Sequence, residues 1–295
     1  MTLTAFPYYG GKNNPKTLNW LLARLPMQNA YLEPFGGSAA ILLNRPRAVI
    51  ETFNDINQDV INFFRQLRDN GPELIRRLQL TPYSREEYEK AQKVLYGPIE
   101  GRVSDLVEWA RLYYVEARQS FTAKTKSGWS YCRSIESRAA KSYSWAAGIE
   151  QLPDILERFR GVQIENDNAL KIIRRYDTED CIIYEDPPYL ISTRTQPEGY
   201  NYEVNTLFHR TLAKLNRELK AKVAVSGYES DLYRELYEEK GWWRFDAADT
   251  SLSSSNREGG ATRSMHESLW CNYDAESIAV ERPESEQELL EDMID

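Results

Sequence analysis

A short buried strand that stops at two prolines constrains this chain most. The apolar run Cys181-Ile182-Ile183-Tyr184 is followed, after one residue, by Asp186-Pro187-Pro188-Tyr189. Such a run predicts a buried strand, and proline ends a strand because it has no backbone N–H to pair. Open α/β sheets bind ligands beyond the carboxyl ends of their strands. The sequence therefore predicts a carboxylate and an aromatic ring at a ligand-binding edge.

Strand and helix patterns alternate along much of the chain. Leucines at helical spacing predict helices over Asn14–Leu25 and Phe208–Leu219, and a shorter helix is expected over Ser38–Leu43, after a glycine turn. This alternation predicts an α/β fold with a mainly parallel sheet covered by helices on both faces. The expected strands are Tyr31–Phe35, Ala48–Phe53, Gly161–Glu165, Cys181–Glu185, Lys222–Ser226, Trp243–Ala247 and Ser268–Tyr273.

Helical segments dominate between Ile56 and about Leu156. We interpret residues 57–150 as a helical insertion that divides one α/β core, formed by residues 1–56 and 151–280. Residues 281–295 hold seven acidic residues and one basic residue, which predicts a disordered acidic tail. The expected helices of the insertion are Val60–Asp69, Arg85–Leu95 and Leu106–Ala117, followed by a loop at Thr122–Ser130.

The net charge of −8 is unusual for a protein that binds nucleic acid, but the charge is unevenly distributed. Residues 118–145 hold six basic residues and one acidic residue, interleaved with Phe121, Trp129 and Tyr131. This stretch indicates either a nucleic-acid surface or a charged helix face. The three cysteines and two histidines lack metal-ligand spacing, so we expect a reducing cytoplasm and no metal site. No apolar stretch is long enough to predict a membrane span, and no signal peptide is expected.

Three further segments carry ligand-binding signals. Glu33-Pro34-Phe35-Gly36-Gly37-Ser38 lies at a strand-to-helix turn, where glycines allow close backbone approach and helix N–H groups suit an anion. Asp55 follows the next strand, where a carboxylate suits ribose hydroxyls but also suits the N-cap of a helix. The segment Phe6-Pro7-Tyr8-Tyr9-Gly10-Gly11-Lys12 predicts a lid, although its spacing is not that of a Walker A loop.

The Asp-Pro-Pro-Tyr segment suits chemistry on an amino group of a base. The exocyclic nitrogen of adenine is a poor nucleophile, because its lone pair is delocalised into the ring. If Asp186 and the Pro187 carbonyl accept its two N–H bonds, the lone pair is freed to attack a sulfonium methyl group. The prolines hold both acceptors rigid before substrate arrives, and Tyr189 offers a face for an extruded base. The alternative, a structural turn, explains the prolines but not the flanking acid and aromatic.

The short segments occur in the order that a known enzyme family uses. The pattern is aromatic-x-Gly-Gly-Lys, Glu-Pro-Phe-x-Gly, Asp-Ile-Asn and Asp-Pro-Pro-Tyr, then a late Ser-Ser-Asn, Gly-Gly-Thr-Arg and Glu-x-Leu run. Over roughly residues 5–275 the chain resembles the Dam-type (D12-class, alpha group) DNA adenine-N6 methyltransferases. The matching segments are Tyr8-Tyr9-Gly10-Gly11-Lys12, Glu33-Pro34-Phe35-Gly36-Gly37, Asp55-Ile56-Asn57, Asp186-Pro187-Pro188-Tyr189, Ser253-Ser254-Ser255-Asn256, Gly259-Gly260-Ala261-Thr262-Arg263 and Glu267-Ser268-Leu269.

The resemblance implies a Rossmann-like class I methyltransferase sheet, with residues 57–150 as a target-recognition domain. It implies site-specific methyl transfer from S-adenosyl-L-methionine to N6 of adenine in double-stranded DNA, by base flipping and direct transfer, in the cytoplasm of a bacterial or phage-infected cell. No obligate protein partner is predicted. The implied catalytic residues are Asp186, Pro187, Pro188 and Tyr189. The implied cofactor residues are Tyr8, Lys12, Pro34, Phe35, Gly36, Asp55, Asp167 and Asp186. The DNA-binding candidates are Arg118, Lys124, Lys126, Trp129, Arg133, Arg257 and Arg263.

Three alternatives stay open at this point. The chain could methylate adenine in RNA, or N4 of cytosine in DNA, although the cytosine enzymes favour serine where this chain has Asp186. It could also be a DNA-binding protein on a catalytically retired fold, although Asp186 and Tyr189 argue against that. The target sequence is not predicted, because Ala117–Ser130 keeps Arg118 and Phe121 but lacks the recognition block of GATC-specific members.

Overall fold

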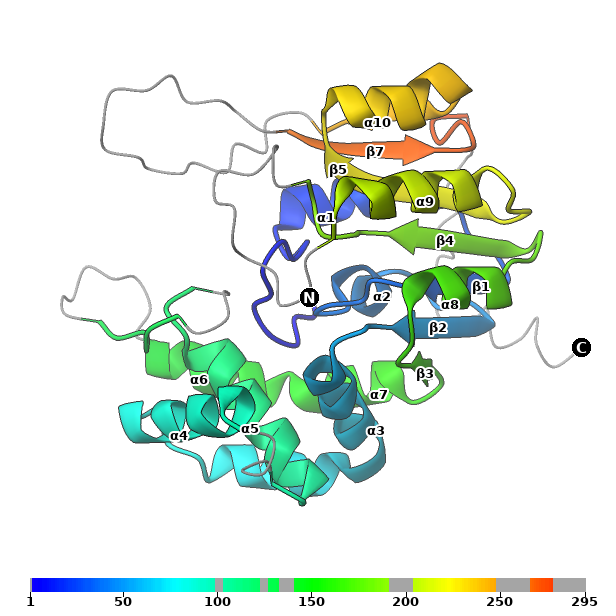
Figure 1. The fold of residues 1–295 in the computed structure, drawn as a ribbon. Helices are drawn as coiled ribbons and strands as arrows, with labels where there is room; N and C mark the ends of the chain where they lie inside the picture. Colours follow the sequence, from blue (N-terminus) through cyan, green and yellow to red (C-terminus); the bar gives the residue numbers. More distant parts are fainter. Residues whose placement is uncertain are drawn as a thin grey trace, which may run out of the picture.

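Seven strands form one sheet in the order β3-β2-β1-β4-β5-β7-β6 (Figure 1). The computed structural model describes residues 2–98, 103–122, 127–132, 141–190, 204–247 and 266–277. Neighbouring strands are parallel except at β7, which pairs antiparallel with both β5 and β6. The predicted Rossmann-like α/β fold is therefore confirmed. The strands are β1 (Ala30–Glu33), β2 (Ile50–Asn54), β3 (Gln163–Glu165), β4 (Cys181–Glu185), β5 (Lys222–Tyr228), β6 (Trp243–Asp246) and β7 (Glu267–Cys271).

Local chemistry sets where β1 and the short helix after it begin and end. β1 ends at Glu33, two residues before the predicted end, because Pro34 cannot donate a backbone hydrogen bond. The Gly36 N–H instead bonds to the Asn54 carbonyl at 2.8 Å, which ties the turn after β1 to the end of β2. The short helix predicted to start at Ser38 starts at Ala40.

Helices cover both faces of the sheet, as predicted, and each face has its own apolar core. On one face, α8, α9 and α10 pack on β4 and β5 through residues such as Ile172, Leu212 and Val223. On the other, α1, α2, α3 and α7 pack on β1 and β2. No helix among the described residues is long and apolar enough to span a membrane. The helices outside the insertion are α1 (Pro15–Leu22), α2 (Ala40–Asn44), α7 (Leu152–Phe159), α8 (Ala169–Arg175), α9 (Thr206–Asn216), α10 (Asp231–Leu236) and the 3-10 helix η3 (Glu238–Lys240).

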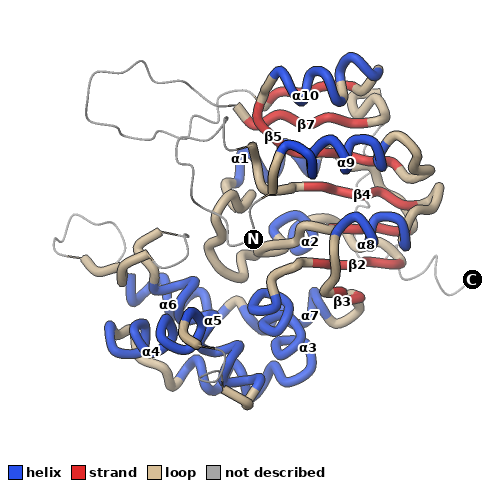
Figure 2. Tube along the Cα trace, in the orientation of Figure 1, coloured by secondary structure: helices blue, strands red, loops and turns tan. Residues whose placement is uncertain are grey.

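The insertion is helical, and Figure 2 shows its helices gathered at the β2–β3 side of the sheet. The predicted helix over Val60–Asp69 is the first part of a longer helix, which is kinked at Asn70 because Pro72 lacks an N–H. The helix α6 was not predicted. The acidic tail at 281–295 lies outside the described residues. The helices of the insertion are α3 (Gln58–Gln79), α4 (Arg85–Tyr96), α5 (Leu106–Gln119) and α6 (Lys141–Glu150).

Aromatic packing joins the insertion to the sheet without a break. Phe53 of β2 makes edge contacts with Phe64 of α3 and Phe159 of α7, and Phe64 stacks on Phe159 with ring centroids 4.3 Å apart. In turn Phe63 of α3 stacks on Tyr114 of α5 at 5.4 Å. All five rings are fully buried. The first half of α3 is therefore shared by the core and the insertion.

Candidate active site

The carboxyl ends of β1, β2 and β4 open onto one cavity of about 280 Å³, which is the edge that the sequence predicts as ligand-binding. The turn Glu33–Ser38 follows β1, Asp55 follows β2 and Asp186 follows β4, while the segment Tyr8–Lys12 lines another wall. The predicted site residues that line this cavity are Tyr8, Lys12, Pro34, Phe35, Gly36, Asp55, Asp186 and Pro188. Segments more than 170 residues apart in sequence thus line one cavity.

Lys12 and Asp186 form an ion pair beside the cavity. The ammonium nitrogen of Lys12 lies 2.8 Å and 2.7 Å from the two carboxylate oxygens of Asp186, and it also donates to the Gly10 carbonyl at 3.0 Å. The Lys12 side chain is only 5% exposed and that of Asp186 19%. Hydrogen bonds between charged groups are stronger where water is excluded. The ion pair therefore fixes the N-terminal segment against the end of β4.

Tyr189 is buried rather than open to the cavity. Its hydroxyl donates to a carboxylate oxygen of Glu267 at 2.5 Å, and its ring meets Tyr228 edge-on with centroids 4.6 Å apart. The Lys12 ammonium lies 4.8 Å from the centre of the ring, on one of its faces. The ring is 4% exposed. Its predicted contact with a base stays a prediction, and in this structure Lys12 holds a position over the ring.

Asp55 is not the N-cap of the helix that follows it. Asn57 is, because its side chain accepts from the Asp59 N–H at 3.0 Å. The Asp55 carboxylate instead accepts from the Gly37 and Asn57 N–H groups, both at 2.8 Å, while it lines the cavity. Burial raises the pKa of Asp55 to about 6, and these hydrogen bonds oppose the rise. The N-cap interpretation of Asp55 is therefore wrong, and its contact with ribose hydroxyls stays a prediction.

The two glycines after β1 are required by neighbouring rings. A side chain at Gly36 would come within 2.0 Å of the Phe53 ring, and one at Gly37 within 2.8 Å of the Tyr8 ring. Gly37 also has a φ of +50°, which favours glycine. Its N–H donates to the Asp55 carboxylate at 2.8 Å, so this N–H is already engaged within the protein. The turn is thus held close to β2 and to the N-terminal segment, and it shapes the cavity wall.

The sequence matches the model of the D12 class N6 adenine-specific DNA methyltransferases over residues 8–250. The chain belongs to this family. A curated relative, the Type II methyltransferase M1.LlaDCHI of Lactococcus lactis subsp. cremoris, is 26% identical over 254 residues, which cover 79% of this chain and 84% of that protein. A solved rRNA methyltransferase, aviRa from Streptomyces viridochromogenes, covers 90% of this chain and 86% of its own, with 13% identity and a TM-score of 0.34.

Membership of this family settles the reaction. The protein is a DNA adenine-N6 methyltransferase, so the family favours the DNA enzyme over the RNA and non-enzymatic alternatives. A methyltransferase needs a methyl donor. Open α/β sheets bind ligands beyond the carboxyl ends of their strands, and this cavity lies there. The fold itself is established by the strand order and by the single antiparallel strand β7.

Other residues of the methyltransferase line the cavity without having been predicted as contacts. Glu33 ends β1, and its carboxyl accepts from the Tyr31 hydroxyl at 2.8 Å and from the Leu42 N–H at 3.0 Å. Burial raises its pKa to about 8. Phe208 lies edge-on to Phe35 at 6.1 Å, and both rings line the cavity. Glu33 stands within a predicted motif, whereas the sequence around Phe208 carries no signal beyond helical spacing.

Asp167, a predicted cofactor residue, is not among the residues that line the cavity; its neighbours Asn168 and Ala169 are. The Asp167 carboxylate accepts from the Asn168 N–H at 2.7 Å and pairs with Lys171 at 3.3 Å. Its main chain is held by Asn54, whose side chain bonds to both the N–H and the carbonyl of Asp167. The cofactor contact of Asp167 stays a prediction.

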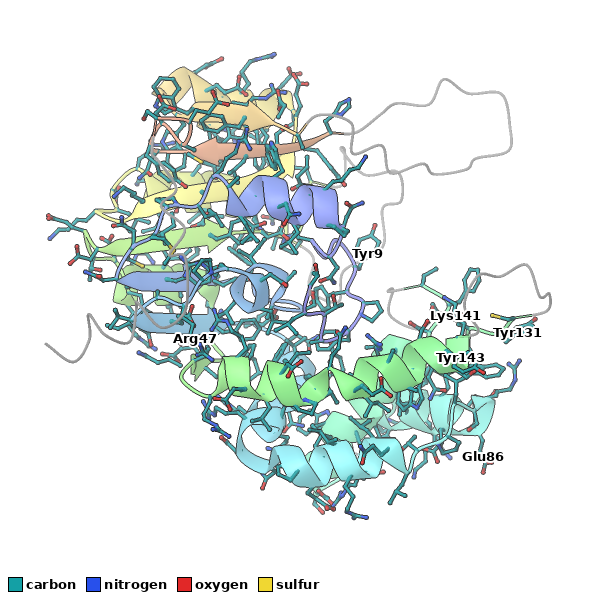
Figure 3. All side chains as sticks on the ribbon, turned by 180° about the vertical axis from the view of Figure 1, so that it is seen from behind. Tyr9, Arg47, Glu86, Tyr131, Lys141 and Tyr143 are labelled. Carbon is teal, nitrogen blue, oxygen red and sulfur yellow. The ribbon has the colours of Figure 1, made fainter. Side chains whose placement is uncertain are left out.

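The predicted DNA-binding residues lie at one end of the insertion or outside the described residues. Arg118 of α5 donates to the Ser144 carbonyl of α6 at 2.7 Å and is half-buried. Trp129 stacks on Tyr131 with centroids 5.8 Å apart. Figure 3 shows Tyr131, Lys141 and Tyr143 at this same end. The residues outside the described part of the chain are Lys124, Lys126, Arg133, Arg257 and Arg263.

Proposed function

We propose that this DNA adenine-N6 methyltransferase uses S-adenosyl-L-methionine and acts on one adenine of a specific duplex site, which it flips out of the helix. The observation that carries the proposal is the Asp186 carboxylate, which stands directly after β4 and lines the cavity. A base inside a duplex cannot reach such a position, so an enzyme with a recessed site must extrude its target. Sequence specificity is supported by likeness to a relative named as a Type II methyltransferase.

The cavity residues fit S-adenosyl-L-methionine. The buried carboxylate of Asp55 has the chemistry to accept from both ribose hydroxyls. Pro34, Phe35 and Gly36 would line the amino-acid end, next to the Lys12 ammonium, which suits a carboxylate. When bound, the cofactor supplies an electrophilic methyl group.

Asp186 and Pro187 would prepare the nitrogen of the base. One Asp186 oxygen accepts one N–H of the adenine amino group, and the Pro187 carbonyl accepts the other. The N–C bond would form as the sulfonium S–C bond breaks, which leaves a neutral thioether, and the surplus proton of the amino nitrogen would pass to the Asp186 carboxylate. No covalent enzyme intermediate is needed. Both acceptors are held rigid, because Pro187 and Pro188 restrict the backbone directly after β4.

Replacement of Asp186 by alanine tests the proposal. We expect Asp186→Ala to abolish N6 methylation of duplex DNA, while circular dichroism and DNA affinity stay as in the wild type. The matched control is Asp180→Ala, which removes an exposed carboxylate before the other end of β4 and should retain full activity. The readout is N6-methyladenine, measured by mass spectrometry of nucleosides. Unchanged turnover in Asp186→Ala would refute the mechanism.

We also expect the basic stretch of the insertion to bind DNA. The residues that would do so are Arg118, Lys124, Lys126, Trp129 and Arg133, with Arg257 and Arg263 near the target adenine.

We propose that the enzyme is located in the cytoplasm of a bacterial or phage-infected cell, where DNA is accessible to it. Methylation-sensitive sequencing of DNA from cells that express the chain would identify the target sequence.

A further inference from the structure

Glu267, the first residue of β7, reaches the active site because of the sheet topology. β7 runs antiparallel to β5, and Glu267 pairs in register with Tyr228, the last residue of β5. The start of β7 therefore lies at the same edge as the carboxyl end of β4. Glu267 is 7% exposed, so its carboxyl is enclosed by protein.

Glu267 contacts two residues of the site. The Tyr189 hydroxyl donates to Oε1 of Glu267 at 2.5 Å. The Lys12 ammonium lies 3.7 Å from this same oxygen and 2.7 Å from Asp186. A single buried cation thus stands between two carboxylates and over the ring of Tyr189.

The contact between Lys12 and Asp186 competes with the proposed role of Asp186. Both carboxylate oxygens of Asp186 accept from the Lys12 ammonium, at 2.8 Å and 2.7 Å. An adenine N–H that donates to Asp186 would share an oxygen with the ammonium, and two donors on one acceptor weaken the hold of Asp186 on Lys12. A buried charge that leaves its partner needs another partner nearby, because an unpaired buried charge is costly.

We propose that Glu267 is a positioning residue for methyl transfer. It receives the Lys12 ammonium as the adenine amino group takes its place on Asp186, and it holds the ring of Tyr189 by the hydroxyl. The ammonium needs to move by only about 1 Å to reach hydrogen-bonding distance of Glu267, compared with an ordinary N–H···O length. This inference rests on the proposed role of Asp186 in accepting the adenine N–H.

The substitution Glu267→Gln separates the effect of the charge at this position from the effect of the side-chain shape. Glu267→Gln keeps an oxygen that accepts from the Tyr189 hydroxyl but removes the charge that Lys12 requires. We expect kcat to fall by about tenfold or more, while KM for S-adenosyl-L-methionine changes by less than about threefold. Glu267→Asp keeps the charge and should recover part of the lost kcat, which a merely structural role would not predict.

The hydrogen bond from the Tyr189 hydroxyl to Glu267 can be tested separately. Tyr189→Phe keeps the ring and removes the hydrogen bond to Glu267, so it should also lower kcat. Because Glu267→Ala removes the same bond, the loss in the double variant should be smaller than the product of the two single losses. The control is Glu238→Gln, since Glu238 supports β7 by accepting from Trp270 at 3.1 Å but lies outside the cavity lining.

The outcomes separate this inference from the proposed function. If the wild type methylates adenine and Asp186→Ala is inactive, but Glu267→Gln and Tyr189→Phe keep kcat within about twofold of the Glu238→Gln control, the role of Glu267 is refuted and the function stands. If Asp186→Ala retains activity, the proposed function itself fails. Thermal unfolding of each variant is measured alongside, and Tyr189→Phe carries the test if Glu267→Gln does not fold.

Discussion

Burial controls the protonation of single carboxyl groups around the cavity. Asp55 and Glu33 both line it, and burial raises their pKa values to about 6 and about 8. Their environments differ in hydrogen bonding. Asp55 is stabilised as a carboxylate by two backbone N–H groups, whereas Glu33 accepts from one N–H and one hydroxyl. Burial thus favours the protonated form of Glu33 more strongly than that of Asp55.

The raised pKa of Asp55 predicts how cofactor affinity depends on pH. Only the carboxylate form can accept from both ribose hydroxyls, so affinity for S-adenosyl-L-methionine should fall as pH decreases through about 6. Asp55→Asn should bind about tenfold or more weakly at pH 7 and should lose this dependence between pH 5 and 6.5. Isothermal titration calorimetry over that range measures both effects. An unchanged affinity in Asp55→Asn would exclude Asp55 from the cofactor site.

Among the elements, β4 ends in a buried acid, Glu185, which comes directly before Asp186. Glu185 is fully buried and accepts from the Asn216 side chain at 2.7 Å, and burial raises its pKa to about 8. The group is protonated in both folded and unfolded chains below its ordinary pKa of 4.5. Between 4.5 and 8 only the unfolded chain loses the proton, so the free energy of unfolding decreases as pH rises.

Replacement of Glu185 by glutamine should remove this pH-dependent decrease in the free energy of unfolding. We expect the free energy of unfolding to decrease less between pH 5.5 and pH 8 in Glu185→Gln than in the wild type, by on the order of 2 kcal/mol. Urea unfolding at the two pH values measures the difference. The control is Glu179→Gln, an exposed carboxylate just before β4, which should behave as the wild type. Equal decreases in all three proteins would show that Glu185 titrates normally.

Elements with a strong local pattern were predicted from sequence, and those set by distant contacts were not. The run Cys181–Tyr184 is apolar along its length, so β4 was predicted with its observed bounds. The predicted helix Val60–Asp69 covers only the first part of α3, and packing against α5 and α7 carries α3 past the kink to Gln79. The hydrogen bond from Tyr189 to Glu267 spans 78 residues, and no local pattern encodes it.

At the scale of the whole molecule, one aromatic core joins the catalytic sheet to the insertion. The rings of Phe53, Phe64 and Phe159 meet where β2, α3 and α7 join, and Phe63 continues the contact to α5. Interiors packed this tightly transmit displacement rather than absorb it. The surface of the insertion is therefore held in a fixed relation to the cavity, which suits an enzyme that reads a site with one part and reacts with another.

On the described surface of the insertion, an arginine that the sequence analysis did not single out stacks on two aromatic rings. The guanidinium of Arg85 lies 4.8 Å from the ring centre of Trp129 and 5.6 Å from that of Tyr131, and Arg85 is exposed. Guanidinium groups stacked on aromatic rings keep their donors free for phosphate. Trp129 and Tyr131 belong to the basic stretch of 118–145, so Arg85 adds its charge to the described part of that stretch.

We therefore expect Arg85→Ala to weaken binding to duplex DNA about three- to tenfold at low salt and to reduce the slope of log affinity against log salt by about 1. The control is Lys90→Ala on the same helix, because Lys90 faces Glu108 of α5, at 3.6 Å, and not the aromatic cluster. Fluorescence anisotropy with a labelled duplex, at several salt concentrations, gives both quantities. A contact to phosphate would position the duplex without taking part in the reaction, so methylation at saturating DNA should be unaffected. If the salt slope of Arg85→Ala equals that of the wild type, then Arg85 and the rings of Trp129 and Tyr131 do not belong to the DNA-binding surface.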